Sequence, residues 1–442
     1  MSKDARRVIQ EKRAAKRKKF IRQRLLLIAA LAVLLISLVF VLADNLGKLS
    51  EQKNTPMNTE TDVTLNETPT DDTLASSGLE TTPQETVDNT VYEVTLVAVG
   101  DVLSHSPLLT MAKQADGTYD FTNYFSVMED TFQAADIAIA NQETIFGDPT
   151  NGYTTYPCFN TPETLGDALV NAGFDVITHA TNHTRDAGVD GIEYCLAYWQ
   201  TNHPQTTVLG IHDSQEASDT ITVYEKNGIT FAMLNYTYGL NGFTIPSEKS
   251  YLVDLMTEDT KEEVLADIKK AEELADFTIV FPHWGTENLV GAYTDEQRTW
   301  AEAFTDAGAD LIIGTHPHVL EPVEWIETAA GNKSLCYYSL GNYISNQQDK
   351  ANNIGGMAKV VIRKQGNVTE IVADESGCVP LINHNDKTGS KSLIRVYPIN
   401  DYTQELLDKH CVYRKSTSFS MDYIKSVAED SLGDFLIWDC EL

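Results

Sequence analysis

The sequence predicts an α/β fold, because strand-like and helix-like segments alternate from about residue 91 onward. Apolar strand-like runs at 92–100 and 136–141 are followed by the amphipathic stretches 162–173 and 188–202. This alternation is typical of sheets whose two faces are both covered by helices. Polar side chains of the Asp, Glu, Asn and His types also stand where several of these strands end. The same pattern therefore predicts a fold and a place for a functional site.

The remaining elements continue the alternation. Further strands are expected at 174–180, 206–210, 220–237 with an Asn-Gly turn, 276–285, 309–316, 334–342 and 355–374. Further helices are expected at 121–135, 258–275 and 295–308. The helix at 162–173 ends on a glycine, which is typical of a helix C-cap. The domain is thus expected to cover 92–375, with an extension at 376–442 that forms two short helices and packs on it.

The N-terminal end predicts a membrane anchor. Residues 1–24 carry eleven Lys or Arg and two acidic residues, and the 19-residue run Leu25–Ala43 that follows has Ser37 as its only polar member. A helix of this length spans roughly 28 Å, close to the hydrocarbon thickness of a bilayer. The alternative is a cleaved signal peptide, but the run exceeds the usual apolar core of about 7–15 residues and no small-x-small cleavage site follows at once.

By the positive-inside rule, the basic tail stays in the cytoplasm and residues 44–442 lie outside the cell membrane, in a single-pass type II arrangement. Residues 44–91 are rich in Thr, Asn, Asp, Glu and Pro, so they are expected to be a disordered linker. This long acidic linker favours a Gram-positive envelope.

Charge and cysteine content narrow the classes of partner. The first 24 residues have a net charge of +9 and the whole chain −31, so residues 25–442 carry −40. Such a surface argues against nucleic acid as a partner, because phosphate contacts need basic residues. Six cysteines outside the membrane permit about 15 complete disulfide pairings, among which Cys411 with Cys440 is one candidate. No CxxC spacing indicates a cysteine metal site.

The functional candidates follow the carboxyl ends of the strands, where the loops of α/β sheets meet and ligands bind. The candidate metal ligands are Asp101, His105, Glu143, Asn182, His283, His316 and His318. Asn141 and Asn342 stand at strand ends as well. This mixed nitrogen and oxygen set suits one or two divalent ions of Mn, Fe, Zn or Mg rather than a soft metal.

The stretch "GTHPH" places two imidazoles two residues apart around Pro317. In an extended segment, residues i and i+2 point to the same side, so His316 and His318 are expected to face one site. Proline fixes φ near −65° and stiffens the loop that presents them.

Several candidates have a second interpretation. Asp186 is either a helix N-cap or a catalytic residue, and His105 either a ligand or the start of a helix. Glu287 is either a ligand or a hydrogen-bond acceptor beside the ligands, and Asn182 either a ligand or a turn residue. The candidate catalytic residues are His183, Asp186 and Glu287.

Six motifs in order, "VGDVL", "NQE", "ATNHTRDAG", "HWGTE", "GTHPHV" and "SLGN", together resemble the bacterial capsule synthesis CapA family of poly-γ-glutamate production. That family is similar to calcineurin-like metallophosphoesterases, so the resemblance implies a four-layer α/β/β/α sandwich with a two-metal centre. Asp101, Glu143, the Asn182–His183 pair, His283 and the His316/His318 pair match the metal-binding elements. This sequence departs from the phosphoesterase pattern at two points: His105 follows Asp101 at a spacing of four instead of two, and position 143 holds Glu instead of Asp.

The resemblance implies an envelope-anchored protein of poly-γ-glutamate or related capsule assembly, which acts on an anionic polymer or a phosphoester beside the membrane components of a polymer synthase. If it is an enzyme, His183 is the expected proton donor to the leaving group. The alternatives are a module that binds or exports the polymer without catalysis, and a metal-dependent surface phosphoesterase unrelated to capsule. Fold-level analogy alone does not choose between them.

Overall fold

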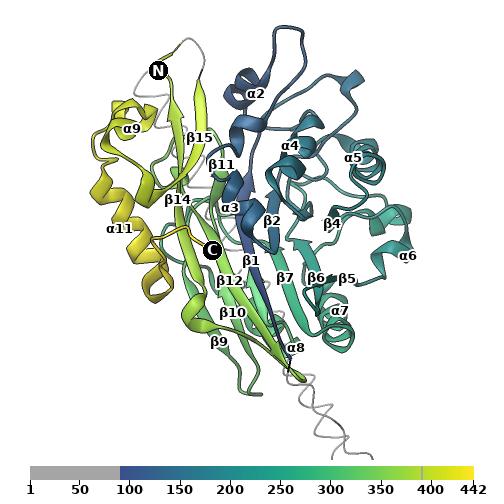
Figure 1. The fold of residues 1–442 in the computed structure, drawn as a ribbon. Helices are drawn as coiled ribbons and strands as arrows, with labels where there is room; N and C mark the ends of the chain where they lie inside the picture. Colours follow the sequence, from purple (N-terminus) through teal and green to yellow (C-terminus); the bar gives the residue numbers. More distant parts are fainter. Residues whose placement is uncertain (1–89, 390–391) are drawn as a thin grey trace, which may run out of the picture. The chain divides into compact units, whose positions relative to one another are not determined.

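The computed structural model describes residues 90–389 and 392–442, which form two β-sheets with helices on their outer faces (Figure 1). The strands of the larger sheet are β1 (Val91–Val102), β2 (Ile137–Gln142), β3 (Val176–Thr178), β4 (Thr207–Leu209), β11 (Asn342–Ile344), β12 (Ile354–Gln365), β13 (Val368–Ile371), β14 (Gly377–Asp386) and β15 (Leu393–Pro398). Their order is β15-β14-β12-β1-β2-β3-β4, with β11 beside β1 and β13 beside β12. Strands β1 to β4 and β11 are parallel, and β12, β14 and β15 add an antiparallel half.

The smaller sheet consists of β5 (Thr222–Lys226), β6 (Ile229–Thr237), β7 (Phe277–His283), β8 (Leu311–Ile313), β9 (Val323–Glu327) and β10 (Lys333–Tyr337). Their order is β5-β6-β7-β8-β10-β9, and β6, β7, β8 and β10 run parallel. The described helices are α2 (Ser106–Ala112), α3 (Glu129–Ala134), α4 (Thr164–Ala172), α5 (Gly188–Asn202), α6 (Gln215–Ser218), α7 (Lys261–Leu274), α8 (Asp295–Ala307), α9 (Gln404–Lys409), α10 (Cys411–Lys415) and α11 (Met421–Leu432).

Three hydrophobic cores explain how the layers hold together. Successive residues of β1 point to opposite faces, so Leu96 and Ala98 pack between the two sheets while Val97 and Val99 pack against the helices α3, α4 and α5. The third core lies between the smaller sheet and the helices α7 and α8. The described residues therefore stack as helices, sheet, sheet and helices, and the predicted mixed α/β class is confirmed.

Two local predictions are confirmed in detail. Helix α4 ends at Gly173, whose φ of 108° is the left-handed conformation expected of a C-cap glycine. The Asn227–Gly228 turn joins β5 to β6 with φ values of 50° and 78°, as a two-residue hairpin requires.

Two other predictions are wrong in part. The helix expected at 121–135 is a 3₁₀ turn at Thr122–Tyr124 followed by the short α3. Here the Asp120 carboxylate accepts hydrogen bonds from the amide and hydroxyl of Thr122 and competes with the helix pattern. The segment 376–442 contains the strands β14 and β15 as well as helices. The sequence did not predict β14 because the buried polar residues Asn383, His384 and Asn385 obscure its strand pattern.

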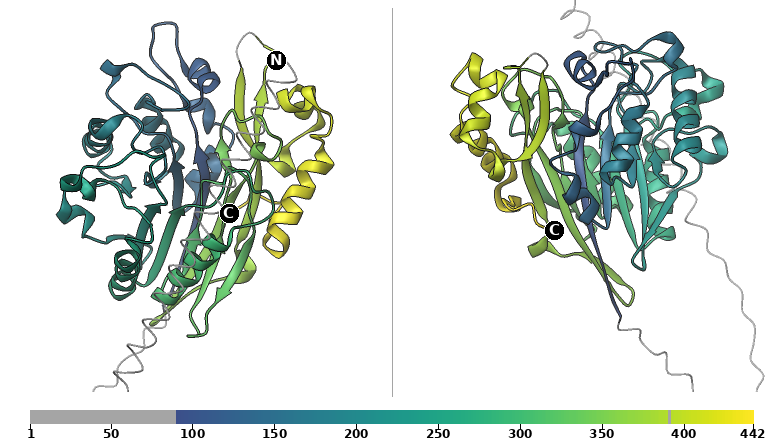
Figure 2. Two further views of the ribbon diagram at one scale, coloured as in Figure 1. Left: turned by 180° about the vertical axis from the view of Figure 1, so that it is seen from behind. Right: turned by 45° about the horizontal axis from the view of Figure 1, so that its top comes forward.

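Residues of α9, α10 and α11 pack on β12 and β14 (Figure 2). Leu407, Val412, Phe419 and Ile424 join the core that contains Ile382 of β14. The C-terminal segment thus completes the larger sheet and also covers part of it.

All six cysteines are free. The candidate Cys411–Cys440 pair is wrong, because the Cys411 thiol lies 3.7 Å from the Gln348 side-chain oxygen and the Cys440 thiol 3.6 Å from the Thr131 hydroxyl. Within 90–389 and 392–442, no helix combines the length and apolarity that a bilayer crossing requires. The predicted basic tail, the span Leu25–Ala43 and the linker as far as residue 89 lie outside the described residues.

Candidate functional site

The candidate site lies at the carboxyl ends of parallel strands from both sheets. In the larger sheet, Asp101 of β1 pairs with Asn342 of β11 and with Asn141 of β2. In the smaller sheet, His283 ends β7 and forms a bridge with Thr315, which follows β8. Residues more than 200 positions apart in the sequence therefore meet at one edge, as strand-end placement predicts.

Asp101 is fully buried and held from two sides. The Asn141 amide donates to one carboxylate oxygen at 2.8 Å, and the Nδ1 of His318 donates to the other at 3.0 Å. The same Nδ1 lies 3.1 Å from the Asn342 side-chain oxygen. These contacts fix Asp101 and His318 with respect to each other.

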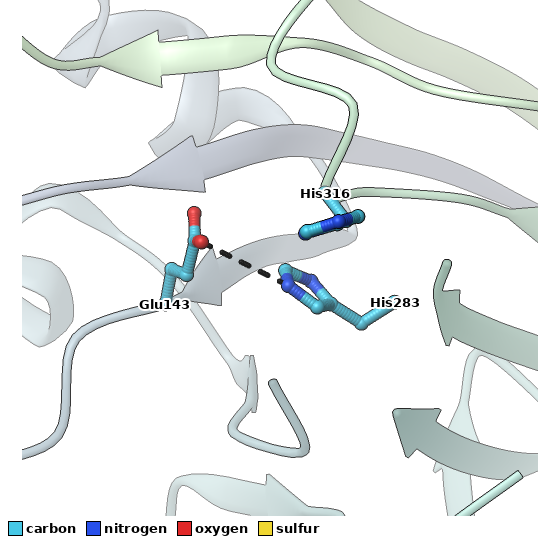
Figure 3. A group of neighbouring side chains, drawn as sticks. All are labelled: Glu143, His283 and His316. Carbon is cyan, nitrogen blue, oxygen red and sulfur yellow. Dashed lines mark ion pairs between the residues drawn. The ribbon is translucent and has the colours of Figure 1, made fainter. Parts of the chain in front are cut away.

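Glu143 lies at the centre of the site. Both of its carboxylate oxygens are buried and have no hydrogen-bond partner. Three imidazole nitrogens surround it, at 3.8 Å for His283 Nε2, 3.8 Å for His318 Nδ1 and 4.0 Å for His183 Nε2. Figure 3 shows the Glu143 carboxylate facing the rings of His283 and His316. A buried carboxylate without donors is costly unless a cation compensates it.

The electrostatics of the centre are strongly perturbed. Burial, followed by the charge of Asp101, raises the pKa of the Glu143 carboxyl well above its ordinary value. Burial alone would lower the pKa of His318, but the carboxylates of Glu143 and Asp101 outweigh it and raise that pKa to about 9. Burial and the neighbouring imidazoles lower the pKa values of His283 and His316 well below the ordinary value. Neutral imidazole is the form that binds a metal ion.

Three overlapping groups of side chains bring their potential ligand atoms within 4.8 Å of one another. They are Glu143 with His283 and His316, Asp101 with Glu143 and His318, and Glu287 with His316 and His318. Glu143, His316 and His318 each belong to two groups. The arrangement can thus hold one or two cations through imidazole nitrogen and carboxylate oxygen.

The loop that presents His316 and His318 differs from the extended segment that the sequence predicts. His316 has a φ of 97° and His318 a φ of 61°, so both adopt the left-handed conformation, which costs free energy in non-glycine residues. Their ring centroids are 5.8 Å apart. Both rings face one site, as predicted, but a loop with left-handed residues presents them instead of an extended segment.

His183 and Asp186 form a hydrogen-bonded pair. The Nδ1 of His183 lies 2.6 Å from the Asp186 Oδ2, which also accepts from the backbone amide of Phe159 at 2.8 Å. The interpretation of Asp186 as a helix N-cap is wrong, because the N-cap of α5 is Ala187 and no side chain caps that helix. The pair leaves the Nε2 of His183 directed toward Glu143.

Asn182 contacts the site through its side-chain oxygen, which lies 3.0 Å from His283 Nε2. The other ring nitrogen of His283 lies 2.9 Å from the Thr315 hydroxyl. Both nitrogens of this fully buried imidazole are therefore oriented by neighbours.

Two candidates stand at the rim. His105 belongs to none of the three groups; its Nδ1 accepts a hydrogen bond from the Asn346 amide at 3.3 Å, and burial lowers its pKa to about 4. Its interpretation as the residue that begins a helix agrees with its place as the N-cap of α2. Glu287 is exposed and contributes to one group.

Three residues near the site have no counterpart among the candidates. Thr315 orients His283, Tyr238 packs its ring 4.7 Å from that of His316, and Asn241 lies 3.3 Å from the Asn182 amide and 3.4 Å from His183 Nδ1. The Asn241–Gly242 dipeptide signals a turn, but nothing in the sequence places that turn over the histidines.

Together the fold and the site define an α/β protein with a buried histidine–carboxylate centre where two sheets meet. A model of the bacterial capsule synthesis protein PGA_cap family matches residues 95–347. The chain belongs to this family, and the resemblance indicated by the six motifs is confirmed.

Two relatives carry names that refer to PGA or capsule biosynthesis. The PGA biosynthesis protein CapA of Bacillus subtilis (strain 168) is 28% identical over 313 residues, which cover 67% of this chain and 76% of that protein. The capsule biosynthesis protein CapA of Bacillus anthracis is 28% identical over 254 residues, which cover 57% of this chain and 55% of that protein. Among solved structures, the calcineurin-like phosphoesterase YfkN from Bacillus subtilis is similar at a TM-score of 0.37 and 11% identity, over 76% of this chain and 99% of that one.

Proposed function

We propose that this chain acts in the synthesis of an anionic capsule polymer, of the poly-γ-glutamate type, through a divalent-metal centre built on Glu143. Membership of the capsule synthesis family supports the polymer. The names of the relatives point the same way, since one is a PGA biosynthesis protein and the other a capsule biosynthesis protein.

One observation carries the metal centre: Glu143 is fully buried, its two oxygens lack hydrogen-bond donors, and imidazole nitrogens stand 3.8 to 4.0 Å away. At that separation the groups do not bond directly, yet each faces the other with a potential ligand atom. A cation among them would compensate the carboxylate, so the residues present fit a metal site.

The side chains that would hold the ion or ions are those of Asp101, Glu143, His283, His316 and His318. Asn182 and Glu287 would add oxygen ligands. When bound, a divalent ion supplies a Lewis acid and lowers the pKa of a coordinated water toward about 7. The ligand set suits Mn, Fe, Zn or Mg.

His183 would move the proton. Its Nδ1 is held by Asp186 at 2.6 Å, so its Nε2 is the nitrogen free to give a proton to a leaving group or take one from a nucleophile. A buried, carboxylate-oriented histidine beside the centre supports catalysis, because a module that only binds polymer does not need one. We therefore favour metal-dependent cleavage or transfer at a bond of the polymer or of its phosphorylated precursor.

The proposal is tested by measuring the turnover of phosphodiester and phosphomonoester substrates with Mn²⁺. Three proteins are compared: the full chain, its His316→Ala variant and the control variant His212→Ala. His212 pairs with Asp254 outside the three groups. Metal-dependent turnover that only His316→Ala abolishes supports catalysis. Metal-dependent binding of poly-γ-glutamate without turnover of any substrate supports the non-catalytic polymer-binding alternative. Turnover without any binding of the polymer supports a hydrolase unrelated to capsule.

We also propose that Leu25–Ala43 anchors the chain in the cell membrane with residues 92–442 outside, near the membrane components of a polymer synthase. The basic tail and the 19-residue apolar run support this orientation. Protease added to intact cells should then remove the C-terminal domain. Protection of that domain in intact cells, with cleavage only after lysis, would exclude the orientation.

A further inference from the structure

Two lysines lie beside the site on segments that the proposed chemistry does not use. Lys387 follows β14, and its ammonium group donates to the side-chain oxygen of Asn346 at 3.2 Å. Lys415 lies at the end of α10, and its ammonium group donates to the side-chain oxygen of Gln348 at 2.8 Å. The two amides contact each other, since Gln348 Nε2 lies 3.3 Å from Asn346 Oδ1. Segments from β14 and α10 thus bring two exposed cations to one loop.

That loop, residues 345–348, starts at the candidate site. The Asn342 amide, whose oxygen lies 3.1 Å from His318 Nδ1, donates to the Gln347 side chain at 2.8 Å. The backbone amide of Asn346 donates to His105 Nδ1. Gln348 Nε2 also donates to the Gln347 backbone oxygen at 3.4 Å, so hydrogen bonds through this loop link the histidine centre to both lysines.

Neither lysine forms an ion pair with a carboxylate in the described part of the chain. Some other cations do, as Arg363 with Glu93 and Lys364 with Asp276, whereas Lys270 and Lys359 also contact uncharged oxygens. Lys387 and Lys415 contact amide oxygens, which position an ammonium group but leave its charge uncompensated. Two ammonium groups without a bonded carboxylate thus lie beside the centre of a protein whose net charge is −31.

The acidic neighbours do not cancel this charge by direct contact. The Asp386 carboxylate accepts from the Thr388 amide at 2.7 Å, and neither it nor Asp349 forms an ion pair with either lysine in the described part of the chain. Both ammonium groups are therefore available to the carboxylates of an approaching polymer.

We infer that Lys387 and Lys415, held by Asn346 and Gln348, form a docking surface for the carboxylates of an anionic polymer as it enters the candidate site. The inference rests on the proposed function, since it names how that site would select its substrate. Because the amides already hold both ammonium groups, little side-chain entropy is lost when carboxylates bind. Repeated weak contacts along a polymer add up through effective concentration.

The inference is tested by measuring the affinity of the full chain for fluorescein-labelled poly-γ-glutamate. The first pair of substitutions is Lys387→Gln/Lys415→Gln, and the control pair is Lys269→Gln/Lys333→Gln. The control pair removes the same charge from α7 and β10, on the smaller-sheet side. The first pair should weaken binding about fivefold to tenfold and flatten its salt dependence between about 50 and 300 mM, and the control pair should change neither. Lys387→Arg/Lys415→Arg should restore binding, because it restores both charges.

Equal affinity of wild type and Lys387→Gln/Lys415→Gln would overturn the inference while leaving the proposed function intact. Absence of any binding by the wild type would instead overturn the proposed polymer and this inference with it. Polyphosphate of matched charge that binds as tightly, with the same dependence on the lysines, would overturn the assignment to carboxylates. Circular dichroism of each variant separates lost contacts from lost folding.

Discussion

The Asp186 carboxylate lies 2.6 Å from the Nδ1 of His183, and this contact decides which face of the imidazole is available. Asp186 accepts at Nδ1, so the other nitrogen, Nε2, is directed at Glu143 4.0 Å away. The rings of Phe159 and His183 are nearly perpendicular, with centroids 4.8 Å apart. A histidine held in this way is prepared for one tautomer and one orientation.

Asp186→Asn should leave the fold intact and lower metal-dependent turnover by about a hundredfold to ten-thousandfold. The NH2 group of asparagine can donate to Nδ1, which favours the His183 tautomer that carries its proton on Nε2. Single-turnover rates across a pH series measure this, with metal content determined in parallel. Loss of metal together with activity would show that Asp186 supports the ligands rather than His183.

Glu143→Gln should have opposite effects on stability with and without metal. In chelator the variant should melt at a higher temperature than the wild type, because it removes a buried carboxylate without donors. With excess Mn²⁺ the wild type should gain about 2.7 kcal/mol at 100 times its Kd, and the variant much less. Thermal melts in the two buffers decide the matter. A wild type that is indifferent to Mn²⁺ would contradict the metal centre.

Thr315→Val should weaken metal binding about 10-fold to 100-fold without unfolding the protein. The Thr315 hydroxyl lies 2.9 Å from His283 Nδ1 and orients the ring, and valine keeps the shape but not the hydrogen bond. Titration of the chelated protein with Mn²⁺ gives the affinity. Thr299→Val on α8, whose hydroxyl bonds only a carbonyl within its own helix, serves as the matched control.

Gly100→Ala should destabilise the protein by about 3 kcal/mol or more, because a Cβ there would overlap the backbone carbonyl of Gly341. The two backbones are this close where Asp101 donates its amide to the Gly341 carbonyl at 2.9 Å. Gly239→Ala meets no atom within 4 Å and should change the free energy of unfolding little. Urea denaturation gives the free energy of unfolding of both variants. Equal values would show that the backbones at Gly100 and Gly341 can move apart at little cost in free energy.

Glu321→Gln should flatten the pH dependence of stability. Burial raises the pKa of the Glu321 carboxyl from 4.5 to about 8, and one of its oxygens has no partner. Between these pH values the folded protein holds the proton more tightly than the unfolded chain. The free energy of unfolding therefore falls with rising pH, by at most about 1.4 kcal/mol per unit. Denaturation at pH 5 and pH 8.5 should show this loss in the wild type and a smaller one in the variant.

The sequence was informative about the site because a sheet converts strand ends into neighbours. Asp101, Glu143, His283, His316 and His318 were candidates from their positions alone, and their ligand atoms do lie together. Asn182 and His183 join them through His283 and Glu143. The role of metal ligand remains a prediction for all of them.

Other features depended on contacts between distant segments. For Asp186 a catalytic role competed with that of a helix N-cap, and only the start of α5 at Gly188 excluded the cap. Its contact with His183 became visible in the tertiary structure alone. The loop around Tyr238 and Asn241 reaches the histidines across the two sheets, and no local pattern encodes that. The strands β14 and β15 were missed because polar residues buried by tertiary contacts interrupt the apolar period.

By itself, the sequence determined the mixed α/β class, most helices and strands, the family and the residue types of the centre, because periodicity, turn chemistry and ordered motifs are local properties of the chain. The tertiary structure alone decided that His316 and His318 adopt left-handed backbone conformations, that Glu143 has no donor and that Lys387 and Lys415 contact the same loop. These features arise from packing between segments far apart in the chain, and the free energy of such packing is not encoded in any short stretch of residues.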